Sequence, residues 1–111
     1  MGITKAEALK AVDRERGPVC EASDRIWDQP ETAFQEFHST DVLCELLEKE
    51  GFRVEKNLAG IATAFSGTYG SGKPVVGILG EFDALSGLSQ ESDSLEKTAL
   101  VDGAPGHGCG H

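Results

Sequence analysis

PVVGILG, residues 74–80, is the stretch of sequence that decides the fold. Its apolar residues follow one another without alternating polar ones, so an extended strand here would be apolar on both faces. A strand of this kind is typical of a sheet that helices cover on both sides. The stretch therefore predicts an α/β protein in which residues 74–80 form a buried strand.

Two helical segments are expected before this strand. Within residues 3–28 apolar side chains recur every three or four positions, as one face of a helix requires. Gly17-Pro18 interrupts the pattern, which predicts a kink, or a break with Pro18 in the first turn of a new helix. A second helix is expected over about 34–50, with Thr32 and Gln35 as a possible capping box.

Gly51 stands where a left-handed helix cap is expected, and strands follow it. Alternating or apolar runs predict strands over 52–57, 61–69 and 74–80, the last two joined as a hairpin through Tyr69–Lys73. The intervening GTYGSGKP approaches a phosphate-binding loop, but a proline replaces the required hydroxyl and no helix pattern follows. A glycine-rich hairpin turn is the better interpretation.

Composition excludes several classes of protein. The 111 residues carry a net charge of −9 and no basic stripe, so a nucleic-acid partner is not expected. No run reaches the ~20 apolar residues that span a bilayer, and no secretory signal is seen, which predicts a cytoplasmic protein without membrane contact. Three cysteines without framework spacing fit a reducing compartment.

Residues with metal-binding chemistry gather after the apolar strand and at the end of the chain. Glu81 and Asp83 follow the strand directly, where open α/β sheets keep their sites, although a solvated turn explains them equally well. In the closing HGCGH, His107, Cys109 and His111 could share one face of an extended backbone and bind Zn²⁺. The alternative is a disordered tail that binds metal adventitiously.

Four blocks of sequence together resemble a known family: IWDQPETAFQEF, EKEGF, GKPVVGILGEFDALSGLSQ and GHGCGH. They are similar to the amidohydrolase branch of the dinuclear aminoacylase/carboxypeptidase-like metallopeptidases, from about Ala11 onward. The resemblance implies an α/β fold, with residues 1–111 as the N-terminal part of a three-layer αβα catalytic domain. That part would contain two helical segments and at least three strands of a mixed sheet, and a lid or dimerisation domain would lie outside it.

The resemblance also implies roles for individual residues. Cys109 and His111 would be metal ligands, Asp83 would be a catalytic residue supporting the centre, and His107 would stand beside the ligands. Two divalent ions, Zn²⁺ or Mn²⁺, would activate the water that attacks an amide carbonyl, with a glutamate outside this sequence moving the proton. The expected substrate is a small N-acyl amino acid such as aminobenzoyl-glutamate, and the full-length enzyme is expected to be an oligomer.

Two hypotheses follow. In the first, the chain is part of a metal-dependent amidase and is inactive by itself. In the second, it is a small free-standing protein that binds metal through HGCGH. The intact mass of the natural protein separates them, because a mass near 11.8 kDa favours the second.

Overall fold

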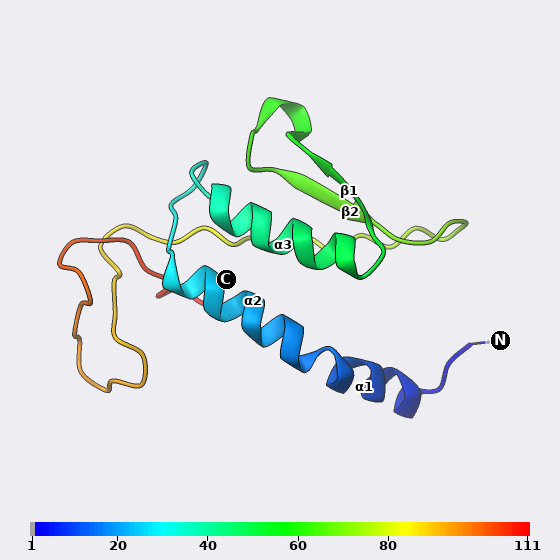
Figure 1. Cartoon of the computed structure of the whole chain (residues 1–111), viewed down its shortest axis with the longest axis horizontal. Coiled ribbons are helices and arrows are strands. Elements are labelled where there is room, and N and C mark those ends of the chain that lie inside the picture. The colour runs from blue at the N-terminus through cyan, green and yellow to red at the C-terminus, as the bar shows by residue number, and fades with distance from the viewer. Residues whose placement is uncertain (1) are drawn as a thin grey trace.

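The computed structural model describes residues 2–111, and its elements are three helices followed by an antiparallel pair of strands (Figure 1). The helices are α1 (Lys5–Arg14), α2 (Arg16–Asp28) and α3 (Phe37–Lys49). The strands are β1 (Arg53–Lys56) and β2 (Phe65–Thr68), with a short 3-10 turn, η1 (Leu58–Gly60), between them. This mixture of helices and strands confirms the predicted α/β class.

Helices α1 and α2 form one interrupted rod. Thr4 caps α1, because its hydroxyl accepts from the Glu7 backbone N–H while the Glu7 carboxylate accepts from the Thr4 N–H. The rod breaks at Glu15, and Pro18 lies in the first turn of α2, where its missing N–H leaves no helical hydrogen bond unmade. The predicted break with Pro18 in a new helix is therefore confirmed.

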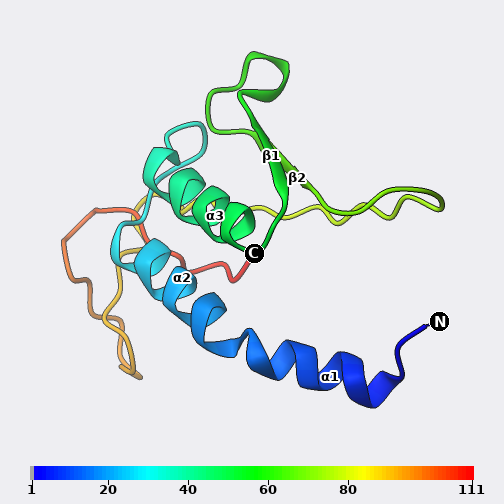
Figure 2. The same cartoon turned by 45° about the vertical axis from the view of Figure 1, so that its right-hand side comes forward.

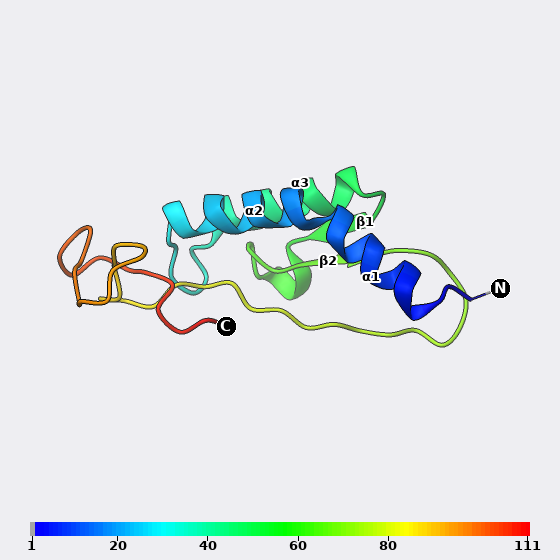
Figure 3. The same ribbon diagram turned by 90° about the horizontal axis from the view of Figure 1, so that it is seen from below.

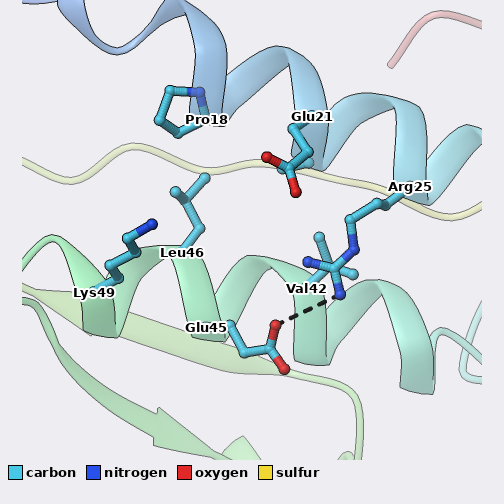
Figure 4. Close-up of a pocket in the computed structure, with 8 residues that line it drawn as sticks. Pro18, Glu21, Arg25, Val42, Glu45, Leu46 and Lys49 are labelled. Atoms are coloured by element: carbon cyan, nitrogen blue, oxygen red, sulfur yellow. Dashed lines mark ion pairs between the residues drawn. The ribbon is translucent and has the colours of Figure 1, made fainter.

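Helix α3 lies beside α2 and runs in the opposite direction (Figures 1 and 2). Ala22 of α2 and Val42 of α3 are buried at this contact. A groove of about 160 Å³ remains between the two helices, and the Arg25 guanidinium lies 3.5 Å from the Glu45 carboxylate across it (Figure 4). Charged side chains from both helices line the groove, so it is not an apolar cavity.

Both ends of α3 are fixed by local interactions. At its end Gly51 adopts φ +87°, and the Phe52 N–H donates to the Leu47 carbonyl at 2.9 Å, so the expected left-handed cap is present. Its beginning differs from the prediction, because α3 begins at Phe37 and not near 34.

The predicted capping box of Thr32 and Gln35 is wrong. These residues instead form a turn in which the Gln35 N–H donates to the Thr32 carbonyl at 2.9 Å. Glu31 caps the helix in their place: its carboxylate accepts from the backbone N–H groups of His38 and Ser39 at 2.9 and 2.7 Å. A carboxylate suits this position because the N-terminus of a helix is the positive end of its dipole.

The strands β1 and β2 form a hairpin that packs against α3. Arg53 pairs with Thr68 and Lys56 with Phe65, and the expected strands over 52–57 and 61–69 are therefore present in shortened form. Gly67 of β2 faces Leu47 and Phe52 so closely that an added methyl group would lie 3.0 Å from a Leu47 methyl carbon.

The third predicted strand and its hairpin are wrong for this structure. Residues 74–80 are neither strand nor helix, and no other segment within residues 2–111 pairs with them. They run as an extended segment below the helices (Figure 3), with Val75, Val76, Ile78 and Leu79 between 80% and 97% exposed. A strand needs neighbours that share its hydrogen bonds, and the described residues supply none here.

The core is small for the length of the chain. Its buried apolar side chains are Ala22, Val42, Cys44 and Ala84. The radius of gyration is 16.5 Å, against about 13 Å for a compact domain of roughly 100 residues. Much of the apolar surface thus stays in contact with solvent. None of the helices within residues 2–111 combines the length and apolar character needed to cross a membrane.

Candidate metal centre

Two isolated backbone pairings bring distant parts of the chain together. Ala84 pairs with Thr32 in parallel orientation, and the Ala84 N–H donates to the Glu31 carbonyl at 2.7 Å. Leu85 pairs with Gly106 in antiparallel orientation, each N–H donating to the other carbonyl at 3.0 Å. The connection between α2 and α3, the segment after the apolar stretch and the end of the chain therefore meet at one place.

Gly106 is required at this meeting point because the backbone approaches too closely for a side chain. A methyl group on its α-carbon would overlap the carbonyl of Leu88. At Gly108 the same addition would lie 3.0 Å from a methyl carbon of Leu88, which is a tight but yielding contact. The glycines of the GHGCGH block thus allow the terminal segment to lie directly on residues 85–89.

Asp83 and His111 touch each other as a result. The Nε2 atom of His111 lies 2.9 Å from Oδ1 of Asp83, and the two side chains are 24% and 26% exposed. Asp83 and the end of the chain, which the resemblance places around one metal centre, are therefore neighbours, although residues 74–80 before Asp83 do not form the expected strand.

Glu81 joins this pair, and we call Glu81, Asp83 and His111 the candidate cluster. One ligand atom from each of them lies within 4.8 Å of the others. Two carboxylates and an imidazole are donors that suit divalent ions such as Zn²⁺ and Mn²⁺. The donor set and its spacing therefore fit a metal ion, which would need further ligands to complete its coordination.

The predicted ligand Cys109 lies next to the cluster but outside it. Its thiol is exposed and free, and it shares a hydrogen bond with His111. That hydrogen bond, and then the one with Asp83, raise the pKa of His111 to about 8. The ring is therefore cationic at neutral pH without metal, and a bound ion would have to displace its proton.

His107 is placed differently from His111. Its ring lies against Trp27 of α2, with the two ring centroids 6.4 Å apart. Its Nε2 atom is buried and has no hydrogen-bond partner among residues 2–111. The role beside the metal ligands that the resemblance implies for His107 stays a prediction, as do the ligand roles of Cys109 and His111.

Two participants were not assigned a site role from the sequence. Glu81 belongs to an acid pair in the sequence, but only the position of its carboxylate, within 4.8 Å of ligand atoms of Asp83 and His111, singles it out from a solvated turn. Glu31 carried no signal, because a carboxylate seven positions before the helix residue it caps matches no short capping pattern.

No protein-family model matches the chain. Comparison with curated proteins, however, shows that the chain belongs to a family of hydrolases that includes peptidases. One relative is a p-aminobenzoyl-glutamate hydrolase subunit of Escherichia coli (strain K12), 46% identical over 101 residues, which are 91% of this chain. Thermostable carboxypeptidases 1 and 2 of Saccharolobus solfataricus are 33% and 32% identical over 89 residues, or 78% of this chain.

The chain spans about a fifth of the length of these relatives: 21% of the hydrolase subunit and 22% of each carboxypeptidase. The family resemblance seen in the four sequence blocks is thereby confirmed. The shared part includes both the helical hairpin and at least some of the residues that follow it, because 101 of the 111 residues are aligned with the hydrolase subunit.

Proposed function

We propose that these residues are the N-terminal portion of the catalytic domain of a metal-dependent amidase. The contact between Asp83 and His111, with Glu81 beside them, carries the proposal because it gathers metal-binding donors from distant parts of the chain. The relatives support the reaction class, since their names describe the hydrolysis of an amide-linked glutamate and of peptides. The remaining catalytic groups, the lid and the rest of the domain would lie in the longer protein.

In this proposal each residue of the site has a physical task. His111 and Cys109 hold a divalent ion, Zn²⁺ or Mn²⁺, and Asp83 fixes the imidazole of His111 through its hydrogen bond. Glu81 adds a carboxylate within reach of the same ion. A pair of bound divalent ions would supply Lewis acidity toward the amide carbonyl. His107 would stand beside the metal ligands, and its ring, packed against Trp27, holds its backbone segment against α2.

The proposed substrate is a small N-acyl amino acid, with aminobenzoyl-glutamate as the first candidate. The 46% identity to a hydrolase of that compound supports this choice. That relative is named as a subunit, so we also propose that the full-length protein assembles with other chains.

The test is to purify the natural protein, measure its intact mass and assay p-aminobenzoyl-glutamate hydrolysis. We expect a mass several times 11.8 kDa and an activity that a chelator removes and Mn²⁺ or Zn²⁺ restores. His111→Ala should abolish the activity, whereas Lys5→Ala on the exposed first turn of α1 should not. A natural mass near 11.8 kDa with tight Zn²⁺ binding would instead favour the free-standing metal-binding protein.

A further inference from the structure

Glu31 makes two kinds of contact from a single residue. Its carboxylate binds the beginning of α3: Oε1 accepts from the Ser39 N–H and hydroxyl, both at 2.7 Å, and Oε2 accepts from the His38 N–H at 2.9 Å. Its backbone carbonyl accepts from Ala84, the residue directly after Asp83, at 2.7 Å. The position of Asp83 is therefore tied to the beginning of α3 through one residue.

The backbone around Glu31 has little freedom to absorb a loss of this anchor. Pro30 precedes it with a fixed φ angle, and Phe34 in the following turn has a φ of +68°. A positive φ is unfavourable for an aromatic residue, so it persists only where neighbouring contacts hold it. The three hydrogen bonds from His38 and Ser39 to the Glu31 carboxylate close the segment of chain that contains Phe34.

We infer that Glu31 is a positioning residue for the metal centre, one that sets Asp83 against His111 by linking Ala84 to the N-terminus of α3. The inference rests on the proposed function for its catalytic meaning, but the link itself is a property of the fold. Glutamine cannot replace the carboxylate, because it offers one acceptor oxygen where Glu31 uses two, and its amide group would face an N–H donor.

Glu36 provides a matched control. It lies at the same end of α3, is also partly buried, and accepts from the Thr63 hydroxyl at 2.7 Å. Its contact holds α3 to the turn before β2 and not to Ala84. Glu31→Gln and Glu36→Gln thus remove the same charge from the same helix end, but only the first disturbs the link to Asp83.

The experiment combines a Mn²⁺ titration, followed by the electron paramagnetic resonance signal of the free ion, with hydrogen exchange measured by mass spectrometry. We expect Glu31→Gln to weaken Mn²⁺ binding about 10-fold or more and to speed exchange at the Ala84 amide. Glu36→Gln should speed exchange near Thr63, because Glu36 accepts from the Thr63 hydroxyl. It should leave the Mn²⁺ affinity within about twofold of the wild type, because Glu36 makes no hydrogen bond to Ala84 and so does not position Asp83. Equal Mn²⁺ affinity and equal Ala84 exchange in the two variants would overturn the inference.

Failure of the proposed function has a different signature. If the wild type binds no Mn²⁺, the metal centre is disproved, and exchange at Ala84 alone decides whether Glu31 positions this segment. Should Glu31→Gln fail to fold, Ser39→Ala gives a milder version, because it removes only the hydroxyl bond to Oε1. It should change the Ala84 exchange in the same direction, and no change would count against the inference.

Discussion

The His111 imidazole meets the Asp83 carboxylate at 2.9 Å although the two residues are 28 positions apart in the chain. The pairing of Leu85 with Gly106 explains how this is possible, because it lies between the two residues and aligns their segments. The contact therefore depends on backbone geometry several residues away from the side chains that form it.

Replacing Gly106 tests this dependence. Gly106→Ala would force a methyl group into the Leu88 carbonyl, so either the Leu85 pairing breaks or the loop moves. We expect a loss of about 1–3 kcal/mol in the free energy of unfolding and loss of the Asp83–His111 contact. Chemical denaturation and the His111 imidazole signals in NMR spectra measure the two effects.

Gly77→Ala is the matched control for that substitution. Nothing lies within 4 Å of a methyl group placed at Gly77, and its φ is not in the left-handed region. It should leave stability and the His111 signals unchanged. If Gly106→Ala keeps the wild-type free energy of unfolding and the wild-type His111 signals, then residues 106–111 do not need the observed backbone pairing.

Acid should weaken the beginning of α3 through Glu31. Burial raises the pKa of its carboxyl, but the hydrogen bonds from Ser39 and His38 outweigh burial and lower the pKa below its ordinary value of 4.5. Because the folded-state pKa is the lower one, the stabilisation is fully present above the ordinary value and disappears as the pH falls through the folded value. Glu31→Gln should therefore differ most from the wild type near neutral pH.

Thermal melts followed by circular dichroism between pH 3 and pH 7 measure this difference. Losing a helix cap costs about 1 kcal/mol, or roughly 4–8 °C in melting temperature for a chain of this size. We expect that gap near pH 7, and we expect it to shrink as the pH falls below 4.5, the ordinary pKa of a glutamate carboxyl, and through the lower folded-state pKa. Glu55→Gln, which removes an exposed carboxylate without a side-chain hydrogen bond within residues 2–111, should show no such gap.

Metal binding by the 111-residue chain should be weak and should depend on the predicted ligands. A structural zinc site has four protein ligands, and Cys109, His111 and one or two nearby carboxylates do not provide a complete set. The free energy of Zn²⁺ binding should therefore be far smaller than the roughly 10–16 kcal/mol of structural zinc sites. Calorimetric titration measures the affinity. His111→Ala should reduce it about 10-fold or more, whereas Asp13→Ala, which removes a carboxylate on α1 outside the candidate cluster, should not.

Co²⁺ tests the assignment of Cys109 separately. A thiolate ligand gives a charge-transfer absorption that oxygen and nitrogen ligands do not give, and Cys109→Ser should remove it. Cys20→Ser, which replaces another exposed thiol, should leave it intact. If the Co²⁺ complex lacks this absorption from the outset, the metal is held by the candidate cluster without Cys109.

The apolar segment at 74–80 should make the chain self-associate at high concentration. Its exposed valine, isoleucine and leucine side chains and unpaired backbone resemble an uncovered sheet edge. Light scattering after size exclusion should give a mass above 11.8 kDa that rises with concentration. Val76→Lys with Ile78→Lys should restore the monomer, while Ser71→Lys with Ser92→Lys adds the same charge elsewhere and should not.

The helices were predictable because their signals are local. Pro18 and Gly51 impose a backbone conformation on their own positions, and the structure breaks and ends its helices beside them. The cap at Glu31 was not predictable in the same way, since its partners are chosen by a turn that the tertiary structure holds. Residues 74–80 show most clearly what a local pattern cannot predict. Their apolar pattern indicates that the segment needs cover on both faces, but a strand forms only where a neighbouring strand pairs with it.

The candidate cluster was partly predictable for a related reason. Residue type and order indicated Asp83 and the closing histidine, and the resemblance supplied their roles. Which donors meet depends on the pairing of Leu85 with Gly106, whose partners are far apart in sequence. The sequence therefore indicated the correct segments. It did not indicate that the Glu81 carboxylate joins the cluster, or that the Cys109 thiol lies outside it and is exposed.

The pairing of Leu85 with Gly106 closes residues 86–105 into a loop. This loop is a suitable place to insert a foreign peptide. The Ser89 N–H donates to the Ala104 carbonyl at the base of the loop, and the Glu91 N–H donates to the Thr98 carbonyl in its middle. Residues 92–97 form a mostly exposed tip, in which the Glu96 carbonyl accepts from the side chains of Gln90 and Ser94. Doubling the length of a flexible loop costs only about 0.6 kcal/mol in closure entropy. An affinity tag or a fluorophore-bearing peptide inserted at this tip should therefore be tolerated, because the hydrogen bonds at the base of the loop would remain.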